Sequence, residues 1–336
     1  MPLPAAFKGR LRLPAVAAPM FLASGPQLVI ECCRAGVIGS FPALNQRSSE
    51  GFENWLTQIE QALDGDERAA PYAVNLIVHR SNPRVQADLA LCVKHEVPIV
   101  ITSLGANRDV IDAVHGYGGL VFHDVINARH ARKAAEAGVD GLILVAAGAG
   151  GHAGTWSPFA LVNEVRAFFD GVLLLSGCLS TGQDIAAAEA IGADLAYMGT
   201  RFINTAECLV HGEYKQMIRD CSAKDILYTP HISGVHANFL RPSIEQAGLD
   251  PDALEPVTEI DFGTELTTDA DDAANGDKKG GAWKAIWSAG QGVGSIDDAP
   301  PAAELIACLR REYHAAVAAR QAHHADWFAN PGEAAR

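Results

Sequence analysis

The chain has 336 residues, of which 49% are hydrophobic, and carries a formal net charge of −14 from 26 basic and 40 acidic side chains. This length and hydrophobic content predict a globular fold with a substantial core, in one large domain or two smaller ones. The negative charge argues against nucleic-acid and anionic-membrane partners, because both would repel the chain, and it favours small-molecule chemistry.

Cysteine usage and the first residues bear on the compartment. The seven cysteines are an odd number, include the adjacent pair Cys32 and Cys33, and show no CxxC spacing, which favours reduced thiols over disulfides or zinc ligands. The start of the chain lacks an apolar segment of signal-peptide length, and no apolar run approaches the ~20 residues that span a bilayer. We therefore expect a cytoplasmic protein that does not enter the membrane.

Short, apolar, β-rich runs recur through the first part of the chain, and their starts lie 21 to 35 residues apart. Continuous apolar runs are typical of parallel strands that are buried on both faces, and the spacing leaves room for one helix and two loops per strand. The runs are PAVAAPM from Pro14, GVIGSF from Gly36, PYAVNLIV from Pro71, VPIVITS from Val97, GLVFHDV from Gly119, DGLILVA from Asp140, GVLLLSG from Gly171 and DLAYMGT from Asp194.

The segments between these runs predict helices, for example over 25–36, 83–95, 127–138 and 181–192. Several begin with a capping residue and end at glycine. Eight strand–helix units of an α/β protein close most simply as a (β/α)₈ barrel, and an open doubly wound sheet is the alternative.

The pattern changes after Cys208. Residues from about Leu209 to Gly280 contain one good helical start and a polar, turn-rich middle, which predicts an insertion or second small domain. The last part returns to a glycine-rich loop and then predicts a long amphipathic helix from near Pro301 that packs on the barrel, with a frayed tail after Phe328. We assign 1–208 and 284–336 to the barrel and 209–283 to a small inserted domain on the substrate side.

In a barrel, the active site lies at the carboxyl ends of the strands. Glycines close both the seventh and the eighth run, where barrels commonly hold a phosphate on backbone N–H groups, although a tight turn alone would also need glycine. The residues at the ends of the runs are Pro19, Met20, Asn75, Ser103, Asp124, Gly150, Gly151, His152, Gly177, Gly199 and Thr200.

The loop after the sixth run combines four glycines, from Gly148 to Gly154, with His152. Glycines let a ligand lie against the backbone, and histidine suits proton transfer near neutral pH. A lone loop histidine is more often a surface residue, but the glycines favour a site. GAGGHA also fits the dinucleotide pattern, yet its place in the sixth unit weighs against that interpretation.

Two further stretches invite a metal interpretation and do not support one. The segment Asp269–Asp277 resembles a calcium loop but lacks a ligand at Ala273 and the spaced glutamate, so we expect a solvated loop. HHAD from His323 is more typical of a polar helix face. We therefore predict no metal site.

Taken together, the motifs resemble those of the nitronate monooxygenase family, formerly called 2-nitropropane dioxygenases. The resemblance covers nearly the whole chain, and the glycine–glycine–histidine loop followed by MGTRF is its most specific part. It implies an FMN-containing (β/α)₈ TIM barrel with a small, mainly α-helical inserted domain. The motifs are APM (18–20), VNL (74–76), AGVDGLILVAAGAGGHAG (137–154), SGCLSTGQDIAAAEAIGADLAYMGTRFINTAE (176–207) and WSAGQGVG (287–294).

The resemblance also implies roles for residues. Met20 and Asn75 would contact the isoalloxazine, and His152 would take the proton α to a nitro group or, as imidazolium, steady the nitronate. Gly177, Gly199 and Thr200 would hold the FMN phosphate. The full expected cofactor-binding set is Pro19, Met20, Asn75, Ser103, Asp124, Gly150, Gly151, Ser176, Gly177, Gly199, Thr200 and Gln291.

The implied reaction oxidises alkyl nitronates with O₂ to an aldehyde or ketone plus nitrite, and a homodimer stays open. One departure from the family pattern is Asp124, a carboxyl where many relatives carry a basic or amide side chain; it would disfavour an anionic reduced flavin unless it is turned away or hydrogen-bonded. Two alternatives stay open: an NAD(P)H:quinone or enoyl reductase on the same FMN barrel, and a flavin-free isomerase or lyase that acts on a phosphorylated substrate.

Overall fold

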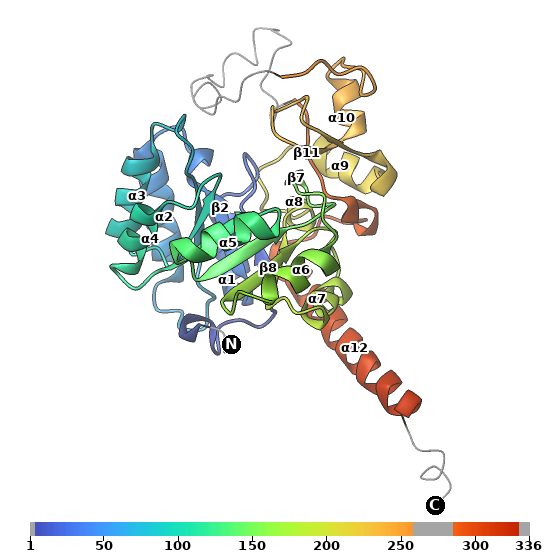
Figure 1. The fold of residues 1–336 in the computed structure, drawn as a ribbon, viewed down its shortest axis with the longest axis horizontal. Helices are drawn as coiled ribbons and strands as arrows, with labels where there is room; N and C mark the ends of the chain where they lie inside the picture. The colour runs from blue at the N-terminus through green and yellow to red at the C-terminus, as the bar shows by residue number, and fades with distance from the viewer. Residues whose placement is uncertain (1–3, 258–284, 329–336) are drawn as a thin grey trace, which may run out of the picture.

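The computed structural model describes residues 4–257 and 285–328, and it confirms the predicted barrel. Eight parallel strands close in chain order, and helices surround them (Figure 1). The open doubly wound sheet is excluded because β9 pairs with β1. The barrel strands are β1 (Ala15–Ala17), β2 (Ile38–Pro42), β3 (Ala73–Ile77), β4 (Ile99–Ser103), β5 (Leu120–Val125), β6 (Gly141–Val145), β8 (Val172–Ser176) and β9 (Leu195–Met198).

The helices begin and end at the residues that favour such ends. Thr181 and Asp184 form a reciprocal capping box at the start of α7, and Gly36 and Gly138 end α1 and α5 in the left-handed conformation that glycine adopts most easily. No described helix is both long and apolar enough to cross a bilayer. The helices around the barrel are α1 (Pro26–Ala35), α2 (Ser49–Leu63), α3 (Val85–Lys94), α4 (Arg108–His115), α5 (Ala128–Ala137), α6 (Pro158–Arg166), α7 (Gly182–Ala190) and α8 (Thr200–Ile203).

The inside of the barrel is filled at its amino end, so that only the carboxyl end is free for a site. Branched and aromatic side chains from alternate strand positions, among them Ile101, Ile143 and Leu174, form this inner core. Phe7 covers it from below and meets Phe122 edge to face, with 6.3 Å between the ring centroids.

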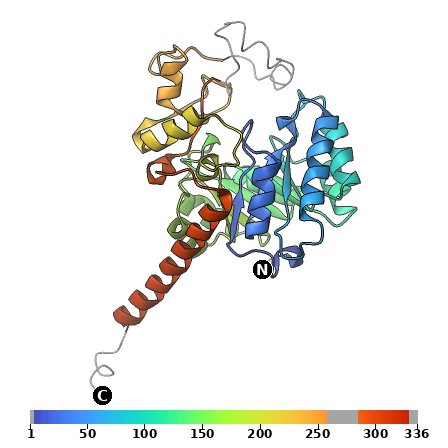
Figure 2. The same cartoon turned by 180° about the vertical axis from the view of Figure 1, so that it is seen from behind.

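The long C-terminal helix α12 (Ala302–Phe328) completes the ring of helices. Its first turns lie against α7 and α1, and Leu305 and Leu309 are buried there. The carboxylate of Glu312 accepts a hydrogen bond from the backbone N–H of Gly182 (2.8 Å). The helix predicted from near Pro301 is therefore confirmed, and its far half projects from the barrel (Figures 1 and 2).

The described residues from α9 to α10 form a cap above the carboxyl end of the barrel (Figures 1 and 2). Its described elements are α9 (Gly212–Asp220), β10 (Ile226–Thr229), β11 (Ala237–Leu240) and α10 (Arg241–Gln246). The short strand β7 (Gly151–His152) pairs antiparallel with β11, as β10 does on its other edge. The assignment of 209–283 to one inserted domain stays a prediction, and the loop Asp269–Asp277 and the tail after Phe328 lie outside the described residues.

Candidate functional site

A cavity of about 690 Å³ opens at the carboxyl end of the barrel, beneath the cap. That size is typical of sites for a small molecule or cofactor. Strand ends, the glycine loop of the sixth unit, the cap and the loop before α12 all contribute to its wall. Of the residues predicted from sequence, those that line it are Pro19, Met20, Asn75, Ser103, Asp124, Gly150, Gly151, His152, Ser176, Gly177, Gly199 and Thr200.

Three predicted residues form one hydrogen-bonded chain across neighbouring strands. The amide of Asn75 donates to the hydroxyl of Ser103 (2.8 Å), and this hydroxyl donates to a carboxyl oxygen of Asp124 (2.6 Å). They meet because each occupies an inward position near the end of β3, β4 or β5. The chain fixes a row of polar atoms along one wall of the cavity.

The carboxyl of Asp124 lies within the protein and faces the cavity. Burial raises its pKa, although the neighbouring His123 and the hydrogen bonds from Ser103 and the backbone of Leu104 act in the opposite direction. Burial, together with the charge of Asp124, also holds the pKa of Tyr197 well above its ordinary value. The sequence predicts that a carboxyl at this position must be either turned away or hydrogen-bonded if it is to lie near an anionic flavin. Asp124 is hydrogen-bonded and faces the cavity.

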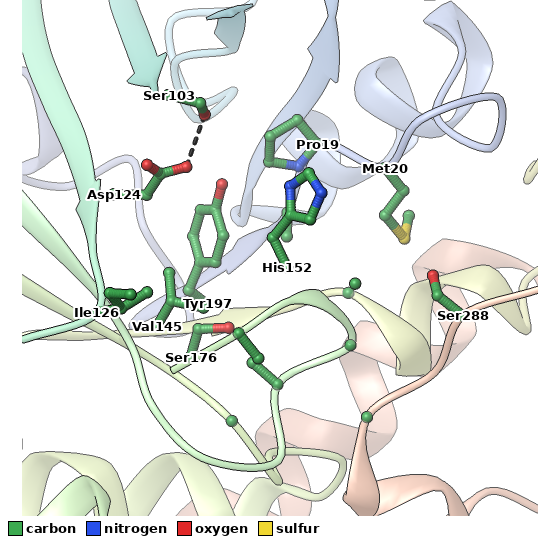
Figure 3. Close-up of a pocket in the computed structure, with 18 of the residues that line it drawn as sticks. Pro19, Met20, Ser103, Asp124, Ile126, Val145, His152, Ser176, Tyr197 and Ser288 are labelled. Carbon is green, nitrogen blue, oxygen red and sulfur yellow. Dashed lines mark hydrogen bonds between the residues drawn. The ribbon is translucent and has the colours of Figure 1, made fainter. Parts of the chain in front are cut away.

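His152 reaches the cavity from the edge strand β7. The pairing of Gly151 with Asn238 and of His152 with Ala237 fixes this strand against the cap. Burial lowers the pKa of His152 to about 4, so the imidazole is neutral at pH 7 and can accept a proton. In the view of Figure 3, His152 stands on one side of the cavity, Asp124 and Ser103 on the other, and Tyr197 between them.

The glycine loop packs too closely for larger side chains. A Cβ on Gly148 would lie 2.4 Å from the sulfur of Cys178, and one on Gly150 would lie 2.8 Å from the backbone nitrogen of Gly290. The side-chain amide of Asn238 donates to the carbonyl of Ala149 (2.6 Å), which ties the loop to the cap. These glycines therefore bring three distant segments together at the cavity.

The two glycines predicted for phosphate binding differ in their backbone. Gly177 has φ +129°, so its turn itself requires glycine. Gly199 has φ −101°, and a Cβ there would meet nothing closer than the side chain of Met20 at 3.8 Å. The turn does not require glycine at Gly199, and its missing side chain leaves the backbone open to the cavity.

The loop before α12 joins this end of the cavity. The hydroxyl of Thr200 accepts a hydrogen bond from the backbone N–H of Gly290 (2.9 Å), and the N–H of Gln291 donates to the carbonyl of Gly148 (2.8 Å). Gly290 and Gly292 line the cavity. Gln291 lies between them with its side-chain oxygen 4.0 Å from the sulfur of Cys178, and its contact with a cofactor stays a prediction.

Sequence reasoning missed several residues of the wall. Tyr197 alternates with the buried Leu195 along β9, and this period of two was the available signal. Tyr228 and His236 come from the cap, where their rings lie 5.2 Å apart and the hydroxyl of Tyr228 donates to the carbonyl of Ala153 (2.9 Å). No local signal placed these two, because the pairing of β7 with β11 is a long-range contact.

Comparison with known proteins agrees with this architecture. A profile of the nitronate monooxygenase family matches residues 10–312. A nitronate monooxygenase of Paraburkholderia phytofirmans is 26% identical over 89% of this chain and 92% of its own length. A (3aS,4S,5R,7aS)-5-hydroxy-7a-methyl-1-oxo-octahydro-1H-indene-4-carboxyl-CoA dehydrogenase of Rhodococcus jostii is 26% identical over 70% of this chain and 65% of its own.

Two solved structures share the fold at 25% sequence identity. Nitroalkane oxidase from Streptomyces ansochromogenes aligns with a TM-score of 0.78 over 94% of this chain and 99% of its own. FabK from Thermotoga maritima aligns with a TM-score of 0.77 over 94% and 97%. The profile match over most of the chain, on a barrel with this cavity, shows that the chain is an oxidoreductase of the nitronate monooxygenase family.

Proposed function

We propose that this enzyme binds FMN in the cavity and oxidises alkyl nitronates with O₂ to a carbonyl compound and nitrite. The observation that carries the proposal is the position of His152, whose partly buried imidazole faces a cavity that Gly177, Gly199 and Thr200 also line. A base and a backbone cradle in one cavity are what a flavin-dependent reaction at an acidic carbon requires.

The residues present fit FMN. A phosphate would lie against Gly177, Gly199 and the hydroxyl of Thr200, where a Cβ-free backbone and hydroxyl groups offer donors. Met20, the glycine loop and Asn75, which starts the polar row, would hold the ring system. Pro19, Ser103, Asp124, Gly150, Gly151, Ser176 and Gln291 complete the proposed set.

When bound, the flavin would supply the redox chemistry, taking electrons from the nitronate and passing them to oxygen. His152 faces the cavity and is unprotonated at neutral pH, so it is the residue placed to take the proton α to the nitro group of a neutral nitroalkane. The cap holds the imidazole in place through the pairing of β7 with β11 and limits the access of water. A substrate that arrives as the nitronate needs no base.

The deciding experiment mixes the purified protein anaerobically with a nitronate and, separately, with NADH and NADPH, while flavin absorbance is followed. Bleaching by nitronate alone, with nitrite released on admission of air, is the expected result. Fast bleaching only by a pyridine nucleotide would replace the proposal with the NAD(P)H-dependent reductase, an alternative in line with the likeness to FabK. A colourless but active protein would point to the flavin-free isomerase or lyase.

A further inference from the structure

The cavity reaches beyond the barrel axis to the start of α5. His130, Lys133 and Ala134 of this helix line it together with Gly105 and Ala106 of the loop after β4. His123, whose imidazole hydrogen-bonds the hydroxyl of Thr102 (2.8 Å), lies beneath this end. Ile126, which follows β5, also lines the cavity and lies on the same side of it as Asp124 in Figure 3.

The start of α5 carries an unusual density of positive charge. Three cations, Arg129, Arg132 and Lys133, are exposed within five residues together with the side chain of His130, in a chain with a net charge of −14. Arg129 stands three residues before Arg132 and four before Lys133, and like charges at these spacings repel. Arg129 also lies in the first turn of the helix, at the positive end of the helix dipole, where a cation is unfavourable. The arrangement costs stability, which an anion would offset.

Within the part of the chain that the structure describes, these cations are not paired with carboxylates. None of the described carboxylates forms an ion pair with Arg129, His130 or Lys133. Arg132 is directed elsewhere, with its guanidinium 3.9 Å from the centre of the Phe168 ring. His130 and Lys133 line the cavity, and Arg129 precedes them on the same helix. We call these three residues the basic rim.

We propose that this basic rim, formed by Arg129, His130 and Lys133, binds a phosphoryl group of the substrate or co-substrate whose other end reacts beside His152. A carboxylate carries one negative charge, whereas a phosphate monoester carries about two at neutral pH and accepts hydrogen bonds in many directions. The inference names the class of molecule that enters the cavity, and it rests on the proposed function only for the reacting end.

The test measures binding of inorganic pyrophosphate by calorimetry in low salt, with FMN present in excess so that the proposed cofactor site does not compete. The double variant Arg129→Gln/Lys133→Gln is compared with the control Lys8→Gln/Arg320→Gln, which removes the same charge at exposed positions elsewhere. We expect at least about a tenfold loss of affinity in the first variant only, and a steep loss for the wild type as salt is raised. Equal affinity in both variants would overturn the inference.

Two nucleotide probes distinguish the sources of the phosphoryl group. Adenosine 2′,5′-bisphosphate stands for a phosphorylated pyridine dinucleotide and adenosine 3′,5′-bisphosphate for a coenzyme A thioester. If Arg129→Gln/Lys133→Gln weakens the binding of either nucleotide, the inference is supported, and that nucleotide identifies the source of the phosphoryl group. If both nucleotides bind the variant as tightly as the wild type, the inference is contradicted. If FMN does not bind, the proposed cofactor fails, while a rim-dependent pyrophosphate affinity still stands.

Discussion

The role of His152 can be tested by comparing two forms of one substrate. A neutral nitroalkane must lose a proton before oxidation, whereas the preformed nitronate has already lost it. In His152→Ala we expect kcat/KM for the nitroalkane to fall by about 10²- to 10⁴-fold, the usual contribution of a positioned base, equivalent to about 3 to 5 kcal/mol of barrier. Turnover of the nitronate should fall by less than about tenfold, because no proton transfer is required.

The structure also sets the pH dependence of this reaction. Because burial lowers the pKa of His152 to about 4, the base is protonated, and activity lost, only as the pH falls through about 4. We therefore expect kcat/KM for the nitroalkane to stay level from pH 7 down to about 5, and not to fall near the ordinary histidine value of 6.5.

The assay follows nitrite release and oxygen uptake, with flavin content measured by absorbance so that loss of cofactor is not mistaken for loss of the base. His231→Ala is the matched control, since this histidine hydrogen-bonds the carbonyl of Leu254 (2.8 Å) and does not line the cavity. Equal losses for nitroalkane and nitronate in His152→Ala, or an acid limb near pH 6.5, would refute the reasoning.

Three further changes test the wall of the cavity. Burial raises the pKa of Asp124, so the folded protein favours its neutral form and loses stability as the pH rises through that pKa. The melting temperature of Asp124→Asn should therefore rise relative to that of the wild type from pH 4 to pH 8. A difference in melting temperature that does not change with pH would contradict the raised pKa. Gly150→Ala places a Cβ 2.8 Å from a backbone nitrogen and should cost about 1 to 3 kcal/mol in denaturant unfolding, against almost no cost for Gly212→Ala, whose Cβ meets open space. Asn238→Ala removes the hydrogen bond to the carbonyl of Ala149, and it should destabilise the protein by about 1 kcal/mol and raise KM for the nitronate. An unchanged KM would show that this contact between the cap and the glycine loop does not affect substrate binding.

Local pattern was sufficient for the barrel. Each of the eight apolar runs became a strand, since burial on both faces of a parallel sheet leaves a continuous apolar signature, and glycine or capping residues marked the helix ends. Because parallel strands present their carboxyl ends at one edge, Asn75, Ser103 and Asp124 were expected at the same end of the barrel, and they hydrogen-bond one another there.

Only the tertiary structure decided what covers and extends the site. The pairing of β7 with β11, the neutral state of His152 and the position of α12 between α7 and α1 all depend on contacts between segments far apart in the chain. Burial, and with it a pKa, is a property of the assembled surroundings and leaves no mark in a local window of sequence. For the same reason the sequence alone indicated no role for the charges of α5, and only the fold places Lys133 on the wall of the cavity.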